Sequence, residues 1–184
     1  MLTATYSFVA ISAEQKIARS ILARLKQYVQ STLSNLQTID VGTLESTLSR
    51  LAQFDSYCRA RKVEMYVIPA MRGSSAEADQ LIVELESFSV AAMHSLTSLY
   101  DSLHRVLEQE TVEIVQLRVA MEQYCDKLFK RFAKEEEELF PLAHRWLSTD
   151  AWFAIGTQFL SDDGNKYAHR RVPPPSVPQV AALA

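Results

Sequence analysis

RFAKEEEELFP, residues 131–141, and RARKVEMYVIP, residues 59–69, share the pattern R-x-x-K-x-E-x-x-x-x-P. In both segments the proline follows a short apolar run at the end of a stretch with helical periodicity. Proline lacks a backbone N–H and disturbs the helical turn that precedes it. We therefore interpret the two segments as matching ends of two equivalent helices.

Apolar residues recur at helical spacing in four long segments, residues 13–36, 43–68, 76–107 and 111–146. Three of the four glycines lie where these patterns break: Gly42, Gly73 and Gly164. Possible capping boxes, Ser12 with Gln15 and Ser74 with Glu77, stand before two of the segments. Short connections between amphipathic helices produce antiparallel neighbours, so we predict an all-α, up-down-up-down four-helix bundle.

The region after the fourth segment predicts a short helix over residues 148–160 that caps one end of the bundle. Its packing face consists of Trp152, Phe153, Ile155 and Phe159. The periodicity is lost from Asp162, and four prolines lie between residues 173 and 178. We therefore predict a bundle domain with its capping helix over residues 1–163 and an extended or disordered Pro-rich tail over residues 164–184.

Composition limits the class of protein. A chain of 184 residues with 48% apolar content can bury one core, and a net charge of -3 with mixed signs argues against nucleic-acid binding. No apolar run is long enough for a membrane span, and residues 1–10 lack the features of a signal peptide. We expect a cytoplasmic protein in which Cys58 and Cys125 are reduced thiols.

The segment DKLFKRFAKEEEELFPLAHRWLSTDAW, residues 126–152, resembles the last helix of hemerythrin-like proteins, the HHE cation-binding family. The resemblance extends over roughly residues 13–163 and is strongest in EEEELFPLA followed by STDAW. It implies a four-helix bundle whose interior, in typical members, holds a dimetal site.

This resemblance also implies which positions match the family's metal ligands. They are Gln15, Arg59, Val63, Ser87, Arg131 and Glu135. A shift of one residue on the second helix would select Ala60 and Glu64 instead. Only Glu135 keeps the expected residue type, and an arginine stays protonated and cannot ligate a cation. The resemblance therefore supports the fold and argues against a bound metal.

Buried guanidinium groups require carboxylate partners. We predict an ion-pair cluster in place of the metal site, built from Arg59, Arg131, Glu64, Glu86 and Glu135. In the alternative arrangement, one or both arginines extend to solvent beside Lys62 and Lys134.

The function that these observations favour is non-catalytic. We expect a binding, scaffolding or regulatory module with no cofactor and an unidentified protein partner. The alternative is an iron-binding member that senses or carries oxygen or a related small ligand, with ligands drawn from Glu64, Glu86, Glu135, Glu136 and a histidine. An enzyme is not expected, because the chain has no phosphate-binding glycine loop and no nucleophile elbow.

Overall fold

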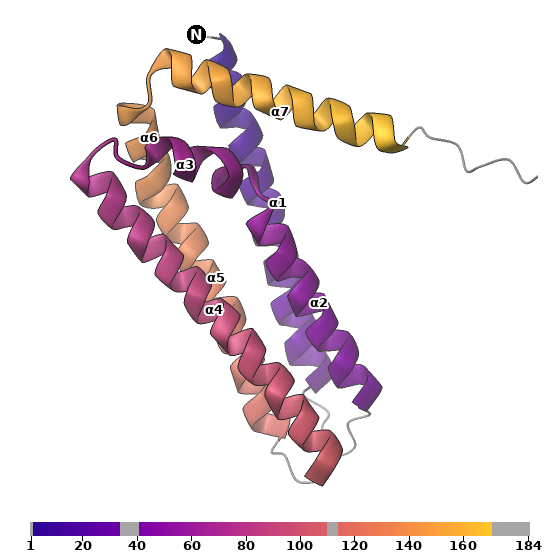
Figure 1. The fold of residues 1–184 in the computed structure, drawn as a ribbon. Coiled ribbons are helices and arrows are strands. Elements are labelled where there is room, and N and C mark those ends of the chain that lie inside the picture. The colour runs from indigo at the N-terminus through magenta and orange to yellow at the C-terminus, as the bar shows by residue number, and fades with distance from the viewer. Residues whose placement is uncertain (1, 34–40, 110–113, 171–184) are drawn as a thin grey trace, which may run out of the picture.

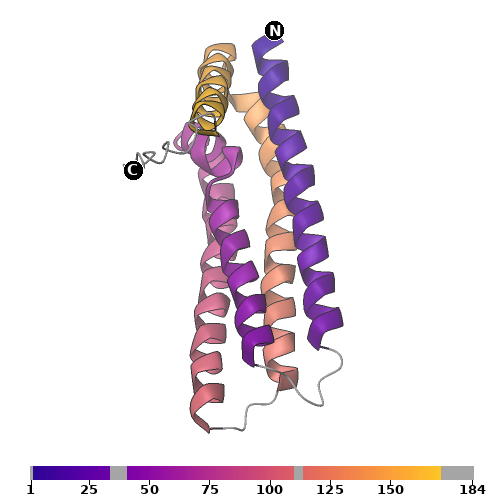
Figure 2. The ribbon, with the colours of Figure 1, turned by 90° about the vertical axis from the view of Figure 1, so that its right-hand side faces the viewer.

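A computed structural model describes residues 2–33, 41–109 and 114–170 of the chain. Every regular element in these ranges is helical, so the all-α part of the prediction is confirmed. The long helices are α1 (Leu2–Leu33), α2 (Val41–Arg59), α4 (Ala76–Gln109) and α5 (Ile114–Lys134). They lie lengthwise beside one another, and consecutive long helices run in opposite directions (Figures 1 and 2).

The packing between these four helices is uneven. The most extensive contacts join α4 to α5 and α1 to α5, and α2 packs against α4. The contact between α1 and α2 is the least extensive of the four pairs. The α5 helix is therefore covered by α1 and α4, while α2 is held more loosely on both of its sides.

Each of the two repeated segments contains one π-helical turn, η1 (Val63–Val67) and η2 (Glu135–Leu139). Short helices α3 (Ile68–Met71) and α6 (Phe140–Trp146) follow, each with proline in its first turn. The amide of Ile68 donates to the Val63 carbonyl, and that of Phe140 to the Glu135 carbonyl, five residues back. The wider turn relieves the clash between a proline ring and the carbonyl four residues before it.

The predicted helix over residues 43–68 is wrong as one continuous element, because α2 ends at Arg59. The amides of Ala60 and Arg61 donate to the Tyr57 and Cys58 carbonyls, three residues back. This tight turn is followed directly by the wide turn of η1. Side chains before and after the break consequently do not keep α-helical register.

Helix α7 (Thr149–Arg170) lies across one end of the long helices and packs against α1 (Figure 1). It extends well beyond the predicted residues 148–160 and passes through Gly164, because one glycine costs a helix only about 1 kcal/mol. The predicted domain boundary at residue 163 therefore falls inside a helix. Residues 171–184 lie outside the described part of the chain, and so does most of the predicted tail.

Two predicted helix starts differ from the structure. Helix α1 begins at Leu2, so Ser12 lies within it rather than at its cap. At the start of α4 the capping hydroxyl belongs to Ser75, which accepts from the Ala78 amide at 3.1 Å, and not to Ser74. Gly73, with a φ of 72°, makes the turn that precedes this cap.

The buried apolar residues form two clusters along the length of the molecule. The first is contributed by α1, α2, α4 and α5, and the second lies near α3, α6 and α7. Most of the apolar residues that recur at helical spacing in the predicted helices are buried in one of them. Five such residues are instead exposed: Ile17, Ile21, Val90, Met93 and Phe153.

Candidate functional site

A layer of buried polar side chains separates the two apolar clusters. On α1, Gln15 lies between Ile11 of one cluster and Ala18 of the other. After α2, Arg61 lies between Cys58 and Val63 in the same way. The layer is completed by Arg131, Glu135 and Glu64, and we call these five residues, Gln15, Arg61, Glu64, Arg131 and Glu135, the polar layer.

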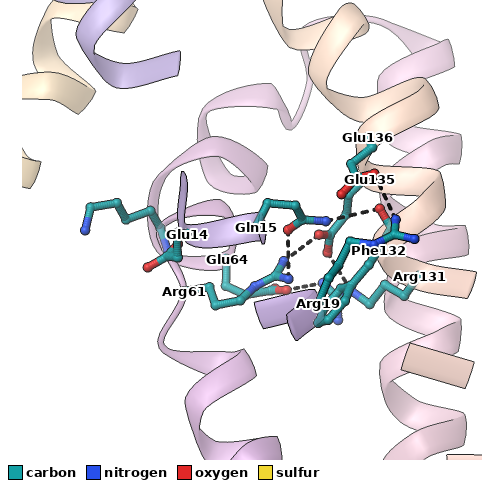
Figure 3. Close-up of polar contacts among 10 residues, drawn as sticks. Glu14, Gln15, Arg19, Arg61, Glu64, Arg131, Phe132, Glu135 and Glu136 are labelled. Carbon is teal, nitrogen blue, oxygen red and sulfur yellow. Dashed lines mark hydrogen bonds and ion pairs between the residues drawn. The ribbon is translucent and has the colours of Figure 1, made fainter. Parts of the chain in front are cut away.

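Arg61 lies at the centre of the polar layer (Figure 3). Its Nη1 donates to Gln15 Oε1 at 3.0 Å, and its Nη2 donates to Glu135 Oε2 at 2.5 Å. The guanidinium carbon lies 4.4 Å from the centre of the Phe132 ring, within the range of a cation–π interaction. Gln15 in turn donates from Nε2 to the Phe132 carbonyl at 3.1 Å. Each contact fixes the orientation of the next.

Glu135 is the carboxylate that both arginines share. While Arg61 occupies its Oε2, Arg131 donates from Nε to its Oε1 at 3.0 Å. Arg131 also donates from Nη2 to Glu64 Oε1. Glu135 is on η2, Glu64 on η1 and Arg131 on α5, so the two π-helical turns face each other through one guanidinium group (Figure 3).

The polar layer is electrically balanced, with two guanidinium groups and two carboxylates. Burial alone would lower the pKa of Arg61, but the Glu135 carboxylate outweighs that effect and the pKa is raised. Burial raises the pKa of Glu64, with Arg131 opposing and the neighbouring Glu135 carboxylate adding to the rise. Arg61 is therefore held as a cation, whereas burial disfavours the charged form of Glu64.

The structure brings together only part of the predicted cluster. Arg131, Glu64 and Glu135 lie in one ion-paired group, but Arg59 does not join them. The Arg59 side chain is 64% exposed and pairs with Asp55 one turn back on α2. Glu86 also lies apart, paired with Arg72 at the surface. The two arginines of the repeat thus differ, one reaching solvent and the other buried.

The remaining positions implied by the resemblance are distributed in three ways. Gln15 is in the polar layer, Val63 is buried in the second apolar cluster, and Ser87 is exposed with its hydroxyl donating to the Glu84 carbonyl. Of the ligands in the iron-binding alternative, Glu136 points outward and pairs with Arg19 at 2.8 Å.

Arg61 is the residue that the sequence interpretation missed. On a continuous α-helix its side chain would point away from that of Arg59 by roughly 200°. The structure keeps this opposition, with Arg59 exposed and Arg61 buried, so the arginine that faces the interior is Arg61. The sequence does contain a signal, because Phe54, Cys58 and Arg61 follow one another at helical spacings of four and three residues.

The donor set of the polar layer does not fit a dimetal centre. Both oxygens of Glu135 already accept from guanidinium groups, and a guanidinium offers no lone pair to a cation. Two fixed positive charges would also repel one. Within residues 2–33, 41–109 and 114–170, no group of three or more histidine, cysteine, aspartate or glutamate side chains is arranged to hold a metal ion.

Comparison of the chain with protein-family models, with curated proteins and with solved structures returned no match. Among the helices that the structure describes, none combines the length and apolar content needed to cross a membrane.

Proposed function

We propose that this chain is a non-catalytic, hemerythrin-like four-helix bundle in which a buried ion-pair layer replaces the dimetal centre. Its role is that of a cytoplasmic binding, scaffolding or regulatory module. The observation that carries the proposal is the shared carboxylate of Glu135, clamped between Arg61 and Arg131 inside the helices. The carboxylate oxygens that would ligate a metal here accept hydrogen bonds from arginine side chains.

The arrangement of the helices supports the bundle assignment. Four long helices lie side by side, and the polar layer joins α1, the segment that follows α2, and the end of α5. Metal sites of four-helix bundles are likewise built from inward-facing side chains at one level. The two π-helical turns also support this assignment, because such turns are frequent at functional sites. The polar layer therefore corresponds to the place where a bundle of this class would hold its ions.

Elemental analysis tests the metal part of the proposal. Protein purified without chelator should contain far less than one equivalent of iron, zinc or manganese, and should show no absorption from an oxo-bridged iron pair. The Arg61→Ala variant provides the matched comparison, because it removes one guanidinium and frees Glu135. Two tightly held irons per chain in the unaltered protein would refute the proposal and favour the oxygen-binding alternative.

The loose contact between α1 and α2 supports the binding part of the proposal. A groove of about 430 Å³ lies between these helices, with Ile21 and Tyr28 of α1 in its lining. Arg24 of α1 and Arg50 of α2 lie on its two sides, and Arg50 stacks 4.6 Å from the centre of the Tyr28 ring. Neither arginine forms an ion pair with a carboxylate of the described residues. The chemistry of this groove suits an amphipathic partner helix with acidic flanks.

A pair of labelled synthetic helices tests this partner chemistry. Both carry leucine at helical spacing on one face, and the remaining positions are glutamate in one peptide and lysine in the other. The glutamate peptide should bind with an affinity that falls as salt rises, and Arg24→Ser with Arg50→Ser should weaken it at least about tenfold. Equal binding of the lysine peptide, or no effect of the two substitutions, would rule out this surface.

A further inference from the structure

A second cavity, of about 530 Å³, lies between α2 and α4 and reaches the polar layer from the side. Val90 and Met93 of α4 and Cys58 of α2 contribute apolar walls, and Leu128 and Phe132 of α5 also line it. The volume falls within the range of small-molecule sites, which are mostly apolar with a few convergent polar groups. An apolar body of moderate size can therefore enter between the two helices.

Arg131 and Glu64, which are paired with each other (Figure 3), both line this cavity. Arg131 is nearly closed off from solvent, whereas the Glu64 side chain keeps 22% of its surface exposed. Arg131 donates to Glu64 Oε1, and no donor among the described residues is hydrogen-bonded to Oε2. The cavity therefore offers a carboxylate oxygen to an incoming donor.

Each carboxylate that lines the cavity is paired with an arginine. Asp55 pairs with Arg59 and Glu64 with Arg131, and Glu86 pairs with Arg72, which lies outside the lining. Glu64 nevertheless keeps its Oε2 without a hydrogen bond from the described residues. The walls around this oxygen are apolar, and a cation interacts with it more strongly there than in open water because the surrounding dielectric is low.

One further group in the lining has an unused hydrogen-bonding capacity. The Ser89 hydroxyl of α4 is buried and has no hydrogen-bond partner among the residues that the structure describes. Buried polar groups are rarely left without a partner, and each such case calls for an explanation. Because the hydroxyl oxygen is closed off from solvent, a ligand N–H would supply the missing bond only after a local shift of the cavity wall.

We propose that the cavity between α2 and α4 binds a small organic cation, an amine carried on an apolar body. The ammonium group contacts Glu64 Oε2, and the body packs on Met93, Leu128 and Phe132. The raised pKa of Glu64 agrees with this assignment, because a cation beside the carboxylate offsets the cost of its burial. The site is independent of whether the polar layer replaces a metal.

Three probes that differ only in their head group test the assignment: phenylbutylamine, phenylbutanol and phenylbutyrate. Titration calorimetry on the full chain should show saturable binding of the amine, at least about tenfold tighter than that of the alcohol, or about 1.4 kcal/mol. The carboxylate should bind more weakly than the alcohol. An amine that binds no better than the alcohol, or that does not saturate up to about 10 mM, would overturn the proposal.

Two substitutions on the exposed side of α4 locate the binding. Glu86→Gln removes one carboxylate of the lining and leaves the Arg72 cation unpaired, so it should weaken binding of the amine at least about fivefold and leave binding of the alcohol unchanged. Val90→Trp fills the entrance of the cavity and should weaken binding of both the amine and the alcohol. Glu45→Gln makes the same charge change on α2, ten residues or about 15 Å before Asp55, and should alter neither. If the amine binds Val90→Trp as tightly as the unaltered protein, the amine binds outside this cavity and the proposal is wrong.

Discussion

Arg61 Nη2 lies 2.5 Å from Glu135 Oε2, and the two side chains are 1% and 0% exposed. They come from positions that are 74 residues apart in the chain. The pair lies between two apolar clusters. Arg61 also donates to Gln15, and Glu135 also accepts from Arg131. A buried ion pair adds little net stability as long as it is intact, but loss of one partner leaves an uncompensated charge.

Removal of the Glu135 carboxylate should therefore be severe. Glu135→Ala leaves two guanidinium groups facing each other in the interior, and we expect the free energy of unfolding to fall by about 3 to 5 kcal/mol. Urea denaturation measures the change. Glu136→Ala, at the next position, breaks only a half-exposed pair with Arg19 and should cost about 1 kcal/mol or less. If Glu135→Ala proves too unstable to purify, Glu135→Gln should remain folded with a smaller loss, and equal stability of all the variants would contradict the buried layer.

The two arginines of the repeat should respond differently to the same substitution. Arg131→Ala removes the cation between Glu64 and Glu135 and should cost about 3 kcal/mol or more. Arg59→Ala removes a largely exposed partner of Asp55 and should cost about 1 kcal/mol or less. Thermal and urea unfolding of the two variants, side by side, checks the difference. A larger loss from Arg59→Ala would mean that the helix register around residue 59 is wrong.

Glu64 should make stability decrease with rising pH. Its pKa is raised in the folded protein, chiefly by burial, so the folded state holds this proton more tightly than the unfolded state. The contribution of Glu64 is greatest below its unfolded pKa of about 4.3 and declines as pH rises from there through the folded pKa. The difference in unfolding free energy between the unaltered protein and Glu64→Gln isolates this effect. If the unaltered protein instead gained stability relative to Glu64→Gln as pH rises, the pKa of Glu64 would be lowered rather than raised.

The two thiols should be inert in the folded protein. Burial raises the pKa of both Cys58 and Cys125 to about 12, so thiolate is scarce at neutral pH. Both cysteines are free and buried. Alkylation by iodoacetamide at pH 8, followed by mass spectrometry, should be slow until urea unfolds the chain. Cys58, which lines the cavity between α2 and α4, should react before Cys125, and rapid labelling of Cys125 would show that α5 is not packed as described.

The long helices could be predicted because burial repeats along them with one period. Leu44, Leu48, Leu51 and Phe54 of α2 are all buried, as their spacing indicates. Ile17 and Ile21 of α1 follow the same helical spacing, which predicts burial, although both are exposed. Their side of α1 faces the loose contact with α2, and periodicity alone does not report how closely a neighbouring helix approaches.

The interior of the site could be predicted only in part, because the repeated pattern pointed to Arg59 rather than to Arg61. Glu135 and Arg131 follow α5 without interruption, so their pairing could be predicted from i,i+4 spacing. Arg61 lies three residues after Cys58, on the buried side, whereas Arg59 lies on the exposed side. Helical spacing does not show which carboxylate Arg61 meets, because Glu135 lies 74 residues further along the chain.

The two π-helical turns place a limit on how the chain length can vary. Each turn carries one residue more than an α-helical turn, and a residue corresponds to about 100° of rotation around a helix axis. Deletion of one residue from η1 or η2 would swing every later side chain of that helical segment by this angle, carrying Met71 or Leu142 away from the apolar cluster that each now fills. The fold should therefore not tolerate single-residue insertions or deletions in these two turns, even at positions where it tolerates substitutions.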